Sequence, residues 1–224
     1  MNPGLFRKRK RRFKKTKNQF QNSYRHPQLL GIFNHAPGIN HRRQVIYCWR
    51  YLAGTIDLKL TLRPDPEDIS DTIKHYTDVT WADDLETRLS RSGSICFWKA
   101  FPVSWNRKKQ HNITLSSTGA KMNTLSNGVQ EGQWIKFLIE ELYNKELKLT
   151  EFQVDNKGLI DKINDFGSKS KTKHLEIKAK WLRDLKKNNE ISVKLIPSEE
   201  MVADALTKNH LTLTHSDNSK RNFS

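Results

Sequence analysis

The hydrophobic and polar positions in the segment 35–55 follow a helical period. After a turn-forming Pro-Gly pair, apolar residues recur there at three- and four-residue steps. These residues are Val45, Ile46, Trp49 and Leu52. Gly54 follows them, and glycine commonly ends a helix. The pattern therefore predicts one amphipathic helix that ends near Gly54.

Beyond the proline-rich, acidic stretch 62–70, the period changes to that of short strands. β-Branched and aromatic residues fill the segments TIKHYTDV, SGSICFWKA, PVSWNRKK and HNITLSS, and they predict three antiparallel strands. A helical period then runs over about 118–143, although Gly119, Gly128 and Gly132 disfavour a regular helix there. The remaining pattern predicts a strand at LTEFQVDN, helices at about 157–163 and 173–187, a strand at ISVKLIP and a short helix at 199–207. The predicted order is βββ-α-β-α-α-β-α, which is typical of an α/β domain.

The net charge is strongly positive and unevenly spread. The chain of 224 residues carries +16, and nine of the eleven residues in RKRKRRFKKTK (Arg7–Lys17) are basic, so subtracting them leaves +7 for the remainder. So dense a charge run cannot bury enough apolar surface to offset its ordering entropy, and we expect a disordered tail at 1–27. The tail suits phosphate contacts or nuclear import, with plain solvation as the alternative. Its candidate nucleic-acid contacts are Arg7, Lys8, Arg9, Lys10, Arg11 and Arg12.

Three aspartates stand where the predicted secondary structure changes. Asp78 lies in HYTDVTW, Asp155 ends EFQVDN, and Asp204 lies in the last helical segment, EEMVADALTK. Carboxylates at strand ends and on an adjoining helix can converge although they are distant in sequence, and converging oxygen ligands are what Mg²⁺ requires. The three residues are therefore candidate metal ligands. Each of them, taken singly, also suits a helix cap or a turn.

Eight short segments occur in an order that resembles the RNase H domain of copia-type long-terminal-repeat retrotransposons. In chain order they are YLAGT, YTDVTW, RLSRSG, SWNRKKQ, LSST, VDN, TKH and ADALTK, and the resemblance covers about residues 30–210. It implies an RNase H-like fold, with a mixed five-stranded sheet flanked by helices. It also implies hydrolysis of the RNA strand of an RNA–DNA hybrid with two Mg²⁺ ions.

The sequence departs from this family at one catalytic position. The family's catalytic positions correspond to Asp78, Lys121, Asp155 and Asp204. Family members continue LSST with Glu-Ala-Glu, whereas this chain has Gly-Ala-Lys, so Lys121 replaces a glutamate that helps to hold a metal. A lysine removes an oxygen ligand and adds a positive charge, so weak or lost Mg²⁺ binding and impaired cleavage are expected. Lys121 is also expected to pair with Asp78 or Asp155. Slow hydrolysis by the three aspartates, with the lysine directed away, is the alternative.

A Gly-Ser pair predicts a loop between the helices at about 157–163 and 173–187. Basic residues near this Gly-Ser loop are candidate contacts to a nucleic-acid backbone. Lys169, Lys171 and Lys173 surround this loop, and His174 follows in the TKH segment. Together with the basic tail they make an RNA–DNA hybrid or duplex the expected partner. Solvated lysines and a structural histidine are the alternatives.

The expected organisation is a tail at 1–27, a connection segment at 28–66, an RNase H-like domain at 67–210 and a polar tail at 211–224. No apolar run approaches the roughly 20 residues of a membrane-spanning helix, and the basic N-terminus lacks the apolar stretch of a secretory signal. We therefore expect an intracellular protein, nuclear or cytoplasmic, with no membrane partner. Three functions remain open: a nucleic-acid-binding protein with impaired cleavage, an active Mg²⁺-dependent hybrid ribonuclease, and a protein-interaction module or non-functional remnant.

Overall fold

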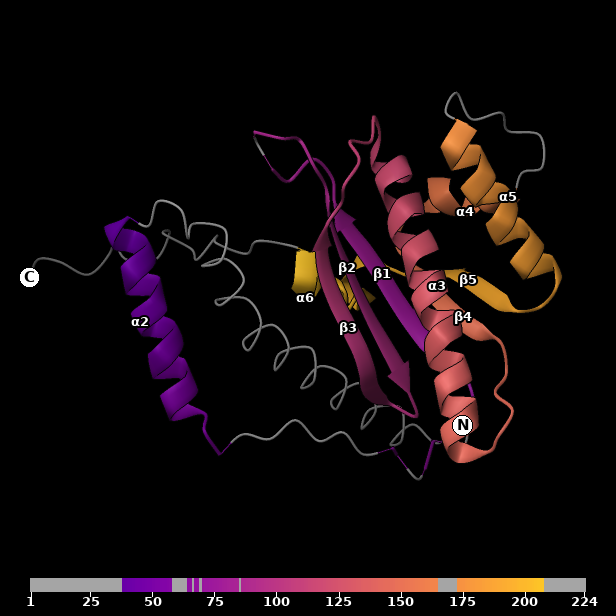
Figure 1. Cartoon of the computed structure of the whole chain (residues 1–224), viewed down its shortest axis with the longest axis horizontal. Helices are drawn as coiled ribbons and strands as arrows, with labels where there is room; N and C mark the ends of the chain where they lie inside the picture. Colours follow the sequence, from indigo (N-terminus) through magenta and orange to yellow (C-terminus); the bar gives the residue numbers. More distant parts are fainter. Residues whose placement is uncertain are drawn as a thin grey trace, which may run out of the picture.

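A mixed five-stranded sheet forms the centre of the domain, with strand order β3-β2-β1-β4-β5 (Figure 1). The computed structural model describes residues 38–57, 64–65, 67–68, 70–84, 86–164 and 173–207. The strands are β1 (Lys74–Thr80), β2 (Arg91–Trp98), β3 (Phe101–Lys109), β4 (Thr150–Val154) and β5 (Ile191–Leu195). β2 runs antiparallel to both of its neighbours, β1 and β3, whereas β4 pairs parallel with β1 and β5 pairs parallel with β4.

Helices cover both faces of this sheet. The described helices are α2 (Ile39–Gly54), α3 (Ser117–Tyr143), α4 (Lys157–Asn164), α5 (Lys173–Lys187), the short η1 (Ser198–Glu200) and α6 (Asp204–Thr207). α3 packs on one face with α4 and α5 beside it, and α6 packs against β1, β2 and β3 (Figure 1). Side chains of β2 alternate between the two faces of the sheet: Cys96 and Trp98 pack with α3, whereas Ile95 and Phe97 pack with Val202 and with Leu206 of α6.

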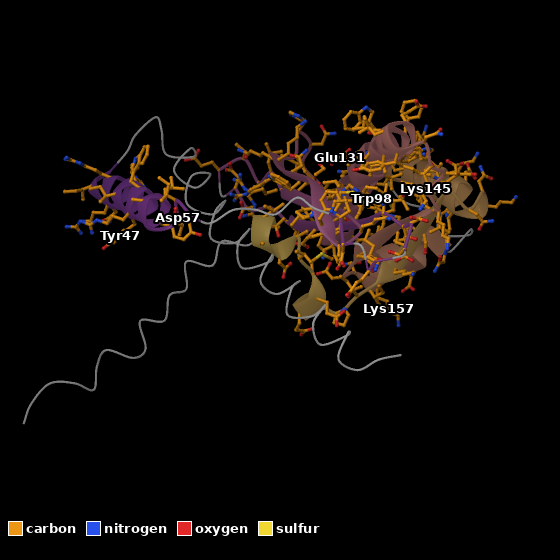
Figure 2. All side chains as sticks on the ribbon, turned by 90° about the horizontal axis from the view of Figure 1, so that it is seen from below. Tyr47, Asp57, Trp98, Glu131, Lys145 and Lys157 are labelled. Carbon is orange, nitrogen blue, oxygen red and sulfur yellow. The ribbon has the colours of Figure 1, made fainter. Side chains whose placement is uncertain are left out.

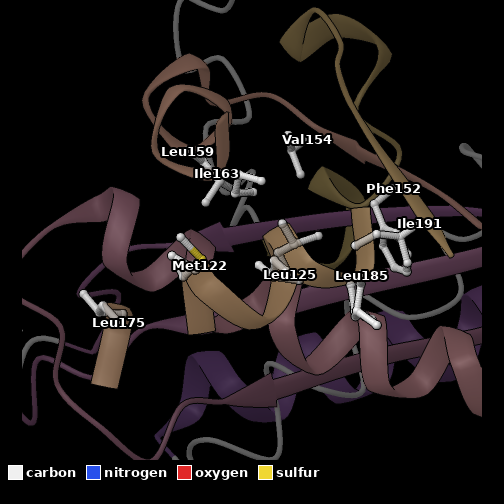
Figure 3. Packing of buried hydrophobic residues seen from close by; sticks show 12 residues of the cluster. Met122, Leu125, Phe152, Val154, Leu159, Ile163, Leu175, Leu185 and Ile191 are labelled. Atoms are coloured by element: carbon white, nitrogen blue, oxygen red, sulfur yellow. The ribbon is translucent and has the colours of Figure 1, made fainter. Parts of the chain in front are cut away.

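The largest cluster of buried apolar residues lies between α3, α4, α5 and the β4–β5 half of the sheet. Met122 and Leu125 of α3 meet Phe152 of β4 and Leu159 of α4 in this cluster (Figure 3). These four side chains are fully buried. The cluster anchors the first half of α3, which carries the candidate catalytic position, to the edge of the sheet where β4 ends.

The predicted element order and the α/β fold class are confirmed, and two predicted elements are wrong. The segment HNITLSS is not a strand but a loop that enters α3, where the carbonyl of Thr114 accepts a hydrogen bond from the Trp81 indole and Ser116 caps the helix. The predicted helix at 199–207 divides into η1 and α6. The tails at 1–27 and 211–224 lie outside the described residues, so the predicted domain limits stay predictions. No described helix is long and apolar enough to cross a membrane.

Candidate functional site

Two aspartates meet at one edge of the sheet because β1 and β4 are parallel neighbours. The register pairs Lys74 with Glu151 and Tyr76 with Gln153, and continuing it four residues from Lys74 brings Asp78 level with Asp155. Asp78 lies within β1 and is 3% exposed, whereas Asp155 follows the last residue of β4. The two candidate metal ligands therefore lie side by side at the carboxyl end of the paired strands.

Lys121 lies between these two carboxylates. Its ammonium group is 3.4 Å from Asp78 Oδ1 and also forms a closer ion pair with Asp155 Oδ1. All three side chains are largely buried, with Lys121 at 15%, Asp78 at 4% and Asp155 at 9% exposure. The predicted pairing is thus present with both aspartates at once. The three groups together carry a formal charge of −1.

The first turns of α3 are held against β2 by a polar cluster, and this cluster fixes the backbone around Lys121. The side-chain amide of Gln110 donates to Ser92 Oγ at 2.8 Å, to the carbonyl of Ala120 at 3.0 Å and to Thr124 Oγ1 at 3.1 Å. At the start of the helix, the Ser116 side chain accepts a hydrogen bond from the amide of Gly119 at 3.1 Å. Gln110 belongs to the SWNRKKQ segment, but this positioning role was not anticipated from the sequence.

α6 completes the site from the opposite face of the sheet. Thr207 donates its hydroxyl hydrogen to Asp78 Oδ2, while the Thr207 carbonyl accepts from Thr80 Oγ1 at 2.8 Å. Asp204 is buried in the first turn of the same helix, one turn before Thr207. Asp78 is therefore bound on one oxygen by a lysine and on the other by a threonine. Sequence reasoning missed Thr207, although it follows Asp204 within the ADALTK segment.

The arrangement does not fit a resident Mg²⁺ ion. Such an ion needs several converging oxygen ligands, and here one oxygen of Asp78 and one of Asp155 face an ammonium group instead. Across the described residues, no group of three or more His, Cys, Asp or Glu side chains is arranged to hold a metal. Lys121 supplies the positive charge that two adjacent buried carboxylates require.

The predicted nucleic-acid contacts are only partly within the described residues. Lys173 and His174 are exposed in the first turn of α5. This end of α5 lies beside the first turns of α3, because Lys178 donates to Asn123 Oδ1 at 2.6 Å. Burial also lowers the pKa of Lys178. Lys173 and His174 thus lie on α5 close to the end of α3 that carries Lys121. Lys169, Lys171 and Arg7–Arg12 lie outside the described residues.

Comparison with known proteins finds relatives among transposon polyproteins. The chain is 29% identical over 179 residues to the retrovirus-related Pol polyprotein from transposon RE1 of Arabidopsis thaliana, and 30% identical over 183 residues to that from transposon TNT 1-94 of Nicotiana tabacum. Each match covers 80% of this chain but only 12% and 13% of the respective polyprotein. No protein-family model matches the chain.

Solved structures with a similar fold are RNase H enzymes. RNase H1 from Halobacterium salinarum NRC-1 covers 60% of this chain and 93% of its own, with 13% identity and a TM-score of 0.45. LC11-RNase H1, determined in complex with an RNA/DNA hybrid, covers 60% of this chain and 92% of its own, with 15% identity and a TM-score of 0.45.

The five-stranded order, the parallel β4 and β5, and the paired aspartates at the β1–β4 edge define an RNase H-like domain. The chain is homologous to a region of retrovirus-related Pol polyproteins from transposons, and it spans about an eighth of the length of the curated relatives that it matches. The resemblance seen in the sequence is confirmed.

Proposed function

We propose that this domain binds RNA–DNA hybrid or a related duplex and does not cleave it by Mg²⁺-dependent hydrolysis. The observation that carries the proposal is the double ion pair of Lys121 with Asp78 and Asp155. The lysine is part of α3 and cannot diffuse away, so a divalent cation that approached these carboxylates would meet a fixed positive charge as well as a missing ligand.

The binding half of the proposal rests on charge. The chain carries +16, and a strongly basic protein gains affinity for nucleic acid through the release of counterions from phosphates. Lys173 and His174 are exposed at the same end of α3 as Lys121, where they are available to a backbone that crosses this edge of the sheet. Action on such a partner requires an intracellular location, in the nucleus or the cytoplasm, and we propose one.

Single-turnover cleavage of a labelled hybrid in Mg²⁺ tests the first half. We expect no cleavage above the detection limit by the wild type, and cleavage by Lys121→Glu at a rate on the order of tenfold or more above that limit, because the glutamate returns an oxygen ligand to the site. Lys121→Met is the matched control, since it removes the charge without supplying a ligand and should leave the protein inactive. Gly119→Glu combined with Lys121→Glu tests whether the other altered position limits the gain.

Fluorescence anisotropy of hybrid and DNA duplexes tests the second half. Hybrid binding by the wild type should not require Mg²⁺, and its affinity in EDTA should be at least as high as in Mg²⁺, because the positive charge at the site is covalently attached and Mg²⁺ competes for the phosphates. Hybrid cleavage by the wild type at a rate that Lys121→Glu does not raise would contradict the loss of catalysis. Absence of hybrid binding at low salt would contradict the binding role and favour a protein-interaction module.

A further inference from the structure

The second half of α3 carries a stripe of large apolar side chains that no described element covers. Its members are Trp134, Phe137, Leu138 and Leu142, and Trp134 and Leu142 are 63% and 70% exposed. They recur at three- and four-residue steps, so they share one side of the helix, and the exposed Glu141 lies among them. Contiguous exposed apolar surface of this kind marks an interaction site.

The helix α2 also carries a stripe of apolar side chains that no described element covers. It contacts no other described element and lies apart from the sheet in two perpendicular views (Figure 1, Figure 2). Val45, Trp49 and Leu52 form an exposed apolar stripe at four- and three-residue steps, with Trp49 at 68% exposure. Isolated helices of about 16 residues are marginal in water, and this one is rich in β-branched and aromatic residues of modest helix propensity. α2 therefore needs a surface to pack on.

The two stripes carry opposite charges. α2 has three arginines and no acidic residue, and Arg42 precedes Val45 and Trp49 on the same side of the helix. On α3 the charged residue within the stripe is Glu141. An antiparallel arrangement of the helices brings the beginning of α2, with Arg42, to the end of α3, with Glu141.

The segment that follows α2 is anchored at Asp65, near the end of the α3 stripe. The amide of Asp65 donates to the carbonyl of Lys99 at 2.9 Å, and the neighbouring Trp98 ring lies 4.7 Å from the ring of Tyr143, the last residue of α3. The ten residues between Gly54 and Asp65 reach roughly 30 Å when extended. The stripe from Trp134 to Leu142 is only about 12 Å long at the helical rise per residue. The end of α2 can therefore reach any point along the stripe.

We propose that α2 of the same molecule packs antiparallel on the exposed α3 stripe. The helix of the connection segment then joins α3, α4 and α5 as a fourth helix on this face of the sheet. The pairing buries Val45, Trp49 and Leu52 against Trp134, Phe137, Leu138 and Leu142, with Arg42 beside Glu141. This inference does not depend on nucleic-acid binding or on catalysis.

Hydrogen–deuterium exchange of the full chain, followed by mass spectrometry, tests the packing. In the wild type we expect α2 amides to exchange roughly tenfold or more slowly than an unstructured peptide, because they open only when the packed helix opens. Trp134→Ser combined with Leu142→Ser should remove this protection and leave the β1 amides unchanged. Ile177→Ser is the matched control, because Ile177 is 69% exposed on α5 and lies outside the stripe.

A charge exchange tests the orientation. Glu141→Arg should reduce the protection of α2, and adding Arg42→Glu should restore it. Unprotected α2 amides in the wild type, or protection that survives the double serine variant, would overturn the proposal. Protection that rises with protein concentration, together with a dimeric mass in light scattering, would assign the stripe to a second copy and overturn packing within one molecule.

Discussion

At the scale of single residues, His75 is the most unusual group outside the site. It is fully buried in β1 and stacks on Phe152 with ring centroids 5.3 Å apart. Within the described part of the chain neither ring nitrogen has a hydrogen-bond partner, and Gly128 and Gly132 of α3 lie against the ring. Burial lowers the pKa of His75 to about 3 from 6.5, because the charged ring would lose its hydration without gaining a partner.

This histidine should make the fold sensitive to acid. Between pH 6.5 and 3 the unfolded chain binds a proton that the folded chain does not, so the free energy of unfolding falls as the pH decreases. From pH 7 to pH 5 the loss from this group is about 2 kcal/mol, since one pKa unit corresponds to about 1.4 kcal/mol. Urea denaturation at both pH values measures it. His75→Leu should lose less stability over this range than the wild type by about that amount. Equal losses in the two proteins would contradict the assignment.

The site shows how far single residues could be predicted. The sequence predicted that Asp78 and Asp155 converge, because carboxylates at strand ends can do so, and the family resemblance added Lys121 to them. The proximity of the three residues is observed. The hydrogen bond from Thr207 to Asp78 could not be predicted, because it depends on the path of the chain after β5 to the opposite face of the sheet. Hydrophobic periodicity carries no information about that path.

At the scale of elements, α3 is the helix for which local propensity was misleading. Three glycines argued against a regular helix, yet α3 is continuous through all of them. Two of these glycines permit close approach to the sheet: a Cβ on Gly128 would lie 2.8 Å from Thr77 Cγ2, and a Cβ on Gly132 would lie 2.9 Å from Phe152 Cζ. Tertiary packing thus offsets the lower helix propensity, which a sequence pattern alone does not reveal.

Substitution of Gly128 by alanine should therefore destabilise the domain. Overpacking costs about 1–3 kcal/mol, and the gain in helix propensity recovers about 1 kcal/mol, so we expect a net loss of up to about 2 kcal/mol. Thermal and chemical denaturation of Gly128→Ala measure the loss. Asn127→Ala is the matched control, because Asn127 is exposed in the same turn and its replacement should be neutral or mildly stabilising. Stabilisation by Gly128→Ala of the same size as in the control would refute the packing argument.

Other elements were predictable to different degrees. The strands and helices that flank the core follow strong two-residue or three- and four-residue periods, and their order agrees with the structure. The segment HNITLSS has the composition of a strand but is a loop, because the Trp81 indole and the start of α3 use its polar groups. Short polar segments of this type are decided by contacts with distant residues rather than by their own pattern.

At the scale of the whole molecule, the uneven charge divides the expected nucleic-acid contacts between two regions. The Arg7–Lys17 run holds nine of the basic residues, and the rest of the chain retains a net +7. This Arg7–Lys17 run, here called the basic arm, lies outside the described residues, so its role stays a prediction. We expect the arm to supply most of the affinity for nucleic acid that is independent of the base sequence. The folded domain then supplies any preference for A-form hybrid over B-form DNA.

Removal of Met1–Lys17 should weaken binding to hybrid and DNA duplexes by a similar factor. It should also flatten the dependence of affinity on salt, because each neutralised phosphate on B-DNA contributes a slope of roughly −0.9 in log K against log salt. Anisotropy titrations at several salt concentrations give both quantities. A variant of full length with the nine basic residues replaced by glutamine separates charge from chain length. An unchanged affinity and slope would leave nuclear import or solvation as the role of the arm.

The ammonium of Lys121 has a further consequence for how this fold responds to its surroundings. A dissociable ion stabilises a protein in proportion to the logarithm of its free concentration, so the stability of a metal-loaded site varies with supply and with chelators. Lys121 is joined to the same chain as Asp78 and Asp155, and its effective concentration at these carboxylates is set by the geometry of α3 alone. The positive charge beside these carboxylates is thereby independent of the supply of dissociable metal ions.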